Sequence, residues 1–82
     1  MNESLTSLHI RAGRALLDWS IRDLAKHADV HPNRISSFEN GHTADPYKLE
    51  QMKAALEAAG VEFLYGAKPG VRLVNARSSS AK

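Results

Sequence analysis

The stretch that decides the fold is SIRDLAKHADVHPNRISSFENG, residues 20–41, because it contains the signals of two short helices joined by a tight turn. The Ser20 hydroxyl can cap a helix that begins at Ile21, and Asp23, three positions after Ser20, completes a capping box. Apolar residues then recur at helical spacing, which predicts a helix with one buried face. Asp tolerates the left-handed backbone conformation that a sharp helix exit needs, so we expect the chain to turn at Asp29.

A second short helix is expected after the turn. Pro32 suits the first position of a helix, because its missing amide hydrogen costs nothing there, and this makes His31 the cap residue. Gly41 is expected to end the helix, and Ile35 and Phe38 to point inward. The outer face is then short and polar, with Asn33, Ser36, Ser37 and Asn40. Two helices in this arrangement are typical of a helix-turn-helix, which places its second helix in the DNA major groove.

These residues resemble the helix-turn-helix of the xenobiotic-response-element family, the group that includes phage lambda repressor and Cro. The resemblance covers most of the chain and rests on four groups of residues. They are Arg14, Leu17 and Ser20 at the start of the motif; Leu24 and Ala25 in its first helix; Val30 in the turn and the inward-facing Ile35; and Glu39, Asn40 and Gly41 at its end. In this family the arginine of the first helix pairs with the glutamate near the end of the reading helix. The resemblance therefore implies a structural bridge between Arg14 and Glu39.

The resemblance also implies which residues face DNA. It places the base-reading positions at Pro32, Asn33, Ser36 and Ser37, with His31 and Arg34 at the margin. Asn33 is the best candidate, because an amide can pair with adenine through two hydrogen bonds. Contacts to the DNA backbone are expected from amides and polar side chains around the motif. These positions are Ser20, Ile21, Arg22, His31, Arg34, Asn40, His42 and Tyr47.

The sequence departs from the family pattern at three positions and in one loop. Ile21 replaces the usual Gln, and its side chain offers no polar group to DNA. Asp29 replaces Gly in the turn, and His31 replaces Ser or Thr at the start of the reading helix. The loop at residues 42–45 reads His-Thr-Ala-Asp rather than being basic, so we expect a modest grip on the DNA backbone.

Two more helices are predicted around the motif. One runs from about Ser7 to Asp18, and Trp19 after it is expected to bury its ring in the core rather than to stack on a base. Asp45 and Pro46 start the other, which Gly60 ends. Its apolar stripe is formed by Leu49, Met52, Leu56 and Ala59.

The end of the helical region is followed by a change of periodicity. VEFLY (61–65) and VRLV (71–74) are short β-branched or aromatic runs separated by a Gly- and Pro-containing turn, which predicts a β-hairpin. A lone hairpin is marginal in water, so it either packs on the helices of its own chain or pairs its edge with another chain. We therefore expect a mainly α fold, a four- to five-helix lambda-repressor-like DNA-binding domain with a C-terminal β-hairpin. Its parts are residues 1–60 as the DNA-binding domain, 61–75 as the hairpin and possible dimerisation element, and 76–82 as a flexible tail.

The composition limits the classes of function. A chain of 82 residues forms one domain with a single core, too small for a substrate cavity between domains. The absence of cysteine excludes a disulfide framework, a thiolate zinc site and a nucleophilic thiol. A formal net charge of +2 is a weaker signal for DNA than a strongly basic domain gives. Because no apolar run suits a membrane span or a signal peptide, we expect no membrane association and a cytoplasmic protein.

Metal and catalytic sites are not indicated. His27, His31 and His42 are the one group with possible metal chemistry, but the predicted turn at Asp29 lies between the first two and breaks their common helical face. The serines of the motif lack a base at a recognisable spacing. We therefore expect no metal, no cofactor and no enzymatic activity, and solvated histidines whose protonation tightens DNA binding as the pH falls.

The resulting hypothesis is a sequence-specific DNA-binding transcriptional regulator, a repressor that acts as a homodimer. One reading helix covers only a few base pairs, so two copies are expected to read a palindromic operator on double-stranded DNA. Two alternatives stay open. One is an antitoxin, which binds its own promoter and also a toxin protein through the hairpin or the tail. The other is a protein-interaction module that keeps the fold without binding DNA.

Overall fold

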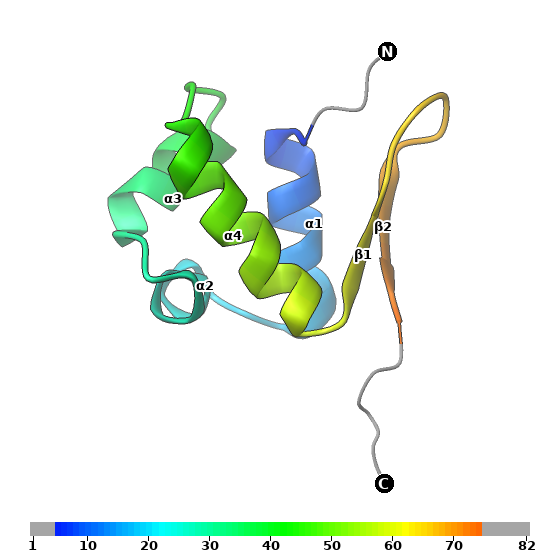
Figure 1. Ribbon diagram of the computed structural model, residues 1–82, viewed down its shortest axis with the longest axis horizontal. Helices are drawn as coiled ribbons and strands as arrows, with labels where there is room; N and C mark the ends of the chain where they lie inside the picture. The colour runs from blue at the N-terminus through cyan, green and yellow to red at the C-terminus, as the bar shows by residue number, and fades with distance from the viewer. Residues whose placement is uncertain (1–4, 75–82) are drawn as a thin grey trace, which may run out of the picture.

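The computed structural model of the chain describes residues 5–74, in which four helices are followed by an antiparallel hairpin (Figure 1). This is the predicted mainly α architecture with a C-terminal β-hairpin. The predicted flexible tail at residues 76–82 lies outside the described residues. The elements are α1 (Ser7–Leu17), α2 (Ile21–Ala28), α3 (Pro32–Glu39), α4 (Pro46–Ala58), β1 (Val61–Leu64) and β2 (Gly70–Leu73).

The first two helices begin at capping boxes. At α2 the predicted box is confirmed, because Asp23 N–H donates to Ser20 Oγ at 3.0 Å and Ser20 N–H donates to Asp23 Oδ2 at 2.8 Å. At α1 the equivalent box joins Thr6 to His9, a pairing that the sequence did not suggest. Asp29 ends α2 with φ 59°, in the left-handed region, as predicted for the turn.

The other two helices begin with proline at their first position, as predicted. The His31 ring accepts a hydrogen bond from the amide of Asn33, which makes it the cap of α3. Asp45 caps α4 in the same manner. The end of α3 differs slightly from the prediction. Its last turn tightens, because Asn40 N–H donates to the carbonyls of both Ser36 and Ser37, and the helix ends at Glu39. Gly41 then leads the chain away with φ 97°.

The core lies where α1, α2 and α4 meet α3 and the hairpin. Its fully buried side chains include Leu24 of α2, Ile35 of α3 and the predicted stripe residues Met52 and Leu56 of α4. Gly13 lets α1 and α4 approach closely, because a Cβ there would lie 3.2 Å from a methyl carbon of Leu56. Trp19 is only half-buried and packs against the edge of this core, so its predicted burial is incomplete.

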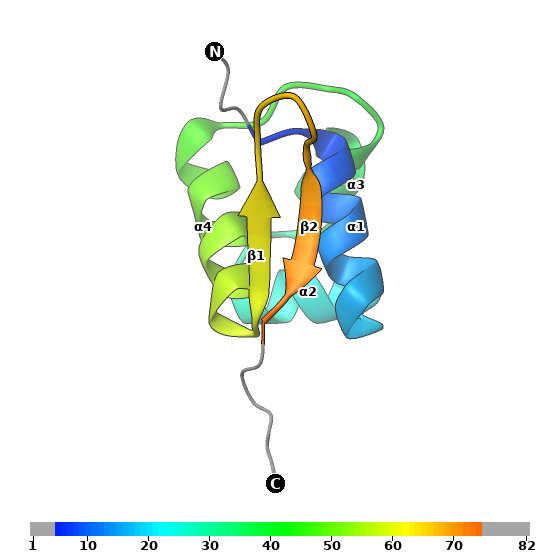
Figure 2. The same ribbon diagram turned by 90° about the vertical axis from the view of Figure 1, so that its right-hand side faces the viewer.

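The hairpin packs on helices of its own chain, with β1 beside α4 and β2 beside α1 (Figure 2). Val61 and Phe63 point into the core, while Glu62 alternates to the outer side. The register pairs Val61 with Leu73 and Leu64 with Gly70. Strand β1 ends one residue before the predicted run 61–65, and β2 begins and ends one residue before the predicted run 71–74. Among residues 5–74 no helix has the length and apolarity that a membrane crossing requires.

Candidate nucleic-acid interface

Helix α3 presents a polar face to solvent. Ile35 is fully buried and holds the helix on the core, while the predicted base-reading residue Asn33 is exposed. Pro32, Ser36 and Ser37 are half-buried, so they are partly accessible at the rim of the same helix. The marginal positions His31 and Arg34 are both exposed.

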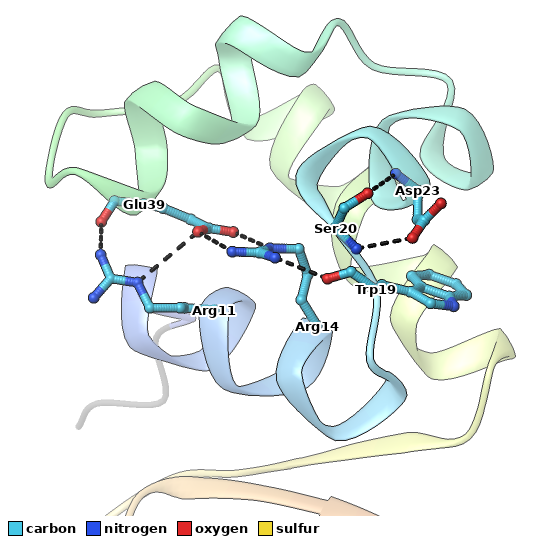
Figure 3. Close-up of polar contacts among 6 residues, drawn as sticks. All are labelled: Arg11, Arg14, Trp19, Ser20, Asp23 and Glu39. Atoms are coloured by element: carbon cyan, nitrogen blue, oxygen red, sulfur yellow. Dashed lines mark hydrogen bonds and ion pairs between the residues drawn. The ribbon is translucent and has the colours of Figure 1, made fainter.

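A buried ion pair fastens α3 to α1 (Figure 3). Arg14 donates from Nε to Glu39 Oε2 and from Nη2 to Glu39 Oε1, both at 2.7 Å, and the Glu39 side chain is only 5% exposed. Arg14 Nη1 also donates to the Trp19 carbonyl at 2.8 Å, which ties in the segment that leads to α2. The hydrogen bond with Glu39 raises the pKa of the Arg14 guanidinium above its ordinary value, although burial opposes the shift. Arg14 and Glu39 thus form the ion pair that the family resemblance implies, with the bidentate geometry of a strong pair.

Arg11 is a second contact to α3 that the sequence reasoning missed. Its Nη2 donates to the Glu39 carbonyl at 2.7 Å and so satisfies a backbone acceptor at the end of α3. Its ion pair with the Glu39 carboxylate is longer, at 3.9 Å, and Arg11 is 53% exposed, so that pair adds little. The signal that could have found it is its position one turn before Arg14 on the same side of α1.

The N-terminus of α2 is the other feature that could meet DNA. The amides of Ser20 and Asp23 are used by the capping box, whereas those of Ile21 and Arg22 have no acceptor among residues 5–74. Free amides at a helix start favour an anion such as a phosphate. The hydrogen bond from the Ser20 backbone, and then that with its side chain, lower the pKa of the Asp23 carboxyl, so this group is charged at neutral pH. Its charge opposes a phosphate at the same helix start, which is consistent with the modest grip expected from the sequence.

The remaining predicted backbone contacts lie around the end of α3 and the start of α4. Asn40, His42 and Tyr47 are all exposed, and Tyr47 is the most exposed large apolar residue in the described part of the chain, at 73%. They flank the loop that leaves the reading helix. Tyr47 and His42 are therefore accessible.

The three histidines of the motif do not form a cluster. His27 stacks on the Trp19 ring, with centroids 4.2 Å apart and planes inclined by 16°, and its Nδ1 lies 2.9 Å from the Asp23 carbonyl oxygen. The His31 ring is engaged at the start of α3. Within the described range no group of three or more potential metal ligands is found.

Comparison with known proteins agrees with this geometry. A family model described as "Helix-turn-helix" matches residues 10–63, which is more than half of the 82-residue chain and extends from α1 to β1. A search of curated proteins gave no match. The matched region contains the α2–α3 pair, the Arg14–Glu39 bridge and the supporting helix α4. The chain therefore belongs to the Cro-like helix-turn-helix family and is in general terms a DNA-binding transcriptional regulator.

Proposed function

We propose that the protein is a repressor that reads a palindromic operator as a homodimer, through the helix from about Pro32 to Asn40. The observation that carries this proposal is the buried Arg14–Glu39 pair, with its two 2.7 Å hydrogen bonds. A base-reading helix must be held in a fixed orientation, because hydrogen bonds to base edges depend strongly on geometry. The pair supplies that rigidity while the polar side of α3 is left accessible.

Within this proposal Asn33 is the principal base-reading residue. Its side chain is exposed on the first turn of α3, and its amide can both donate to and accept from adenine in the major groove. Ser36 and Ser37, one turn later, contact bases or phosphates, and Pro32 makes apolar contact with a thymine methyl group. His31 and Arg34 lie at the margin of the same face.

The contacts to the DNA backbone come from two places. The first is the start of α2, where the amides of Ile21 and Arg22 lack an acceptor among the described residues. The second is the end of the reading helix and the loop after it, with Asn40, His42 and Tyr47. A protein with several such contacts loses affinity steeply as the salt concentration rises.

Selection of bound sequences from a random DNA library tests the proposal. Enrichment of an inverted repeat is expected, and an unenriched pool contradicts it. Titration of Asn33→Ala against single-base variants of the selected site should then show about 1–3 kcal/mol less discrimination at one base position. Glu57→Gln, an exposed change on α4 away from the reading helix, is the matched control and should keep wild-type discrimination.

An antitoxin is a second candidate function, favoured by exposed apolar side chains on α1 and the hairpin such as Leu8 and Leu73. In that case a second small protein should co-purify with the chain through this surface. The third alternative, a protein-interaction module that does not bind DNA, is distinguished by measuring operator binding at different salt concentrations. It predicts no operator binding even at low ionic strength, where a DNA-binding protein binds most tightly.

A further inference from the structure

An aromatic stack closes the connection between α1 and α2. Trp19 lies in that connection, one residue before the cap of α2, and His27 lies in the last turn of α2. Their ring centroids are 4.2 Å apart and their planes are inclined by 16°, so the two rings lie face to face. Trp19 is half-buried against the core and His27 is exposed, which places the stack at the surface. The stack therefore ties the last turn of α2 to the segment that leads into its first turn.

The backbone of Trp19 is held by Arg14 of α1. Trp19 N–H donates to the Arg14 carbonyl at 2.9 Å, and the Trp19 carbonyl accepts from Arg14 Nη1 at 2.8 Å (Figure 3). The same guanidinium forms the buried pair with Glu39 of the reading helix. A side chain that packs on the indole therefore acts on a segment that is joined directly to α2 and, through Arg14, to α3.

The hydrogen bond of the His27 ring fixes its tautomer. Nδ1 lies 2.9 Å from the Asp23 carbonyl oxygen, and this oxygen can only accept, so Nδ1 carries a proton. The lone pair of the neutral ring is then on Nε2, for which no hydrogen-bond partner is found within residues 5–74. Because the ring is exposed, Nε2 can take a proton from solvent without loss of the hydrogen bond or the stack.

A proton on His27 strengthens three interactions. The ring becomes a cation over the face of the Trp19 indole, well inside the range of about 6 Å for a cation–π interaction. The hydrogen bond from Nδ1 to the Asp23 carbonyl becomes charge-assisted. The charge also lies in the last turn of α2, where the helix dipole favours a cation. Protonation therefore holds the last turn of α2 more firmly on the connection.

The charged groups around His27 allow this protonation. On α2 itself, the Asp23 carboxylate lies one turn earlier and favours a cation, whereas Lys26 is a neighbouring like charge. The hydrogen bond from the Ser20 backbone is the main cause of the lowered pKa of Asp23, and the charges of His27 and Lys26 add to it. Within residues 5–74, no carboxylate of α1, α3, α4 or the α1–α2 connection forms an ion pair with the ring. A charged His27 therefore offsets part of the Asp23 charge that opposes a phosphate at the start of α2.

We propose that His27 is a positioning residue for DNA, and that its proton, acting through the stack on Trp19, makes DNA binding tighter as the pH falls. The inference rests on the proposed function and concerns the backbone contact at the start of α2. The amides of Ile21 and Arg22, which are proposed to meet a phosphate, follow directly after the connection that the stack holds. Their orientation therefore depends on that connection.

The position of His27 separates this role from a direct contact. His27 lies six residues after Ile21, which is about 9 Å along the helix axis, so it does not touch a phosphate bound at the start of α2. The sequence predicts histidines that are solvated and attract phosphates directly. In the structure one face of the His27 ring is covered by Trp19 instead, so the charge acts on the protein's own joint.

Tryptophan fluorescence of the full chain without DNA tests the stack, because Trp19 is the only tryptophan. A protonated imidazole on the indole quenches its emission, so the wild type should lose intensity in one step between about pH 8 and about pH 5. His27→Phe keeps a flat ring on the indole but cannot be protonated, and should show no step. His42→Gln, which removes another exposed histidine, should keep the step. A step of equal size in His27→Phe, or none in the wild type, would overturn the proposal.

Operator affinity as a function of pH tests the positioning role. Between about pH 8 and about pH 5.5, the affinity of the wild type should rise about 2- to 5-fold more than that of His27→Phe, the factor that a surface cation–π interaction supplies. Trp19→Leu keeps a histidine that can be protonated but removes the aromatic face, so its pH dependence should match that of His27→Phe. Trp19→Phe restores an aromatic face and should recover part of the difference. A Trp19→Leu variant with the pH dependence of the wild type would show that charge alone acts, and would overturn the proposal.

The two measurements separate this inference from the proposed function. Absence of DNA binding at every pH, with the fluorescence step present, refutes the proposed function and with it the positioning role. DNA binding with the same pH dependence in the wild type and His27→Phe refutes the positioning role alone.

Discussion

Helix α1 is fastened on two sides by polar contacts, and the two sides use different chemistry. On the side of the reading helix, Arg14 and Glu39 form a buried pair of opposite charges. On the side of the hairpin, the His9 ring is 4% exposed and its Nε2 lies 2.8 Å from the Leu64 carbonyl oxygen of β1. Because Thr6 N–H donates to Nδ1 of the same ring, the proton resides on Nε2 and is donated to Leu64. The reading helix is thus held by a charged pair, and the hairpin by a hydrogen bond from the His9 ring.

The difference predicts how each side fails. Removing one member of a buried ion pair leaves the other charge without a partner, whereas removing His9 leaves only a carbonyl and a helix start unsatisfied. The charged contact should therefore have the larger effect on stability. It should also affect DNA binding directly, because it orients α3, while the His9 contact should affect the hairpin and its surface.

The largest effect is expected from Glu39→Ala. The change leaves the Arg14 guanidinium, whose side chain is 17% exposed, without its carboxylate, and should lower the free energy of unfolding by about 4 kcal/mol. A small domain has only about 5–15 kcal/mol in total, so this loss is a large part of the stability of the fold. Urea denaturation followed by circular dichroism measures the loss.

A double variant shows whether charge itself is responsible. Arg14→Met with Glu39→Leu replaces the pair by apolar groups of similar size and should recover much of the stability lost in Glu39→Ala. Affinity for operator DNA should stay reduced, because α3 then lacks the two directional hydrogen bonds that orient it. A double variant as unstable as Glu39→Ala would contradict this account of the reading side.

The next largest effect is expected from His9→Ala, which should lower the free energy of unfolding by about 2 kcal/mol because the Leu64 carbonyl loses its donor. Hydrogen exchange should become faster in the hairpin than in α3. His9→Gln separates the two roles of the ring. Gln restores a capping box with Thr6, so recovery of α1 without recovery of the hairpin would assign the larger part to the Leu64 contact. Equal acceleration of exchange in α3 and in the hairpin would show that the two sides are not independent.

The two sides also differ in how far the sequence predicts them. The α2–α3 pair follows from local signals, since Ser20, Asp23 and Pro32 act on their nearest neighbours and the structure uses each as expected. The Arg14–Glu39 contact spans 25 positions and follows only from the family pattern, because no spacing rule connects residues so far apart. No family pattern predicts the contact of His9. Its contact with Leu64 spans 55 positions and depends on where the hairpin docks, which local propensity does not specify.

The placement of the site shows the same limit. Accessibility of Asn33 follows from the helical period, since Ile35 must point inward and Asn33 then lies on the other side. The half-burial of Trp19 does not follow from the helical period. Its ring is covered on one side by His27, and this contact forms only when the connection between α1 and α2 has its folded conformation. The exposed edge of β2 likewise depends on which strand lies next to which helix. Local structure is therefore readable from the sequence, while the surfaces that neighbouring elements create together are not.

A smaller effect is expected at the capped start of α2. Ser20→Ala removes the hydroxyl that accepts from Asp23 N–H at 3.0 Å and should lower the free energy of unfolding by about 1 kcal/mol. Thr6→Ala is the equivalent change at α1, on the hairpin side. Operator affinity should fall for Ser20→Ala but not for Thr6→Ala, since only α2 carries amides proposed to contact DNA. Equal losses of affinity in quantitative binding assays would remove the distinction between the two helix starts.

The smallest effect is a pH dependence of stability that arises from Asp23, at the start of α2. Hydrogen bonds from Ser20 lower the pKa of Asp23 below its ordinary value of 3.8 in the folded state. A carboxyl with a lowered folded pKa contributes stability that is present above its unfolded pKa and is lost as the pH falls through the folded pKa. The stability advantage of the wild type over Asp23→Asn should therefore be constant near neutral pH and should shrink below about pH 4. Glu57→Gln, which removes an exposed carboxylate outside the capping box, controls for the change in net charge. Chemical unfolding at a series of pH values measures the difference, and an advantage that persists unchanged in acid would mean that the Asp23 charge contributes nothing to holding α2.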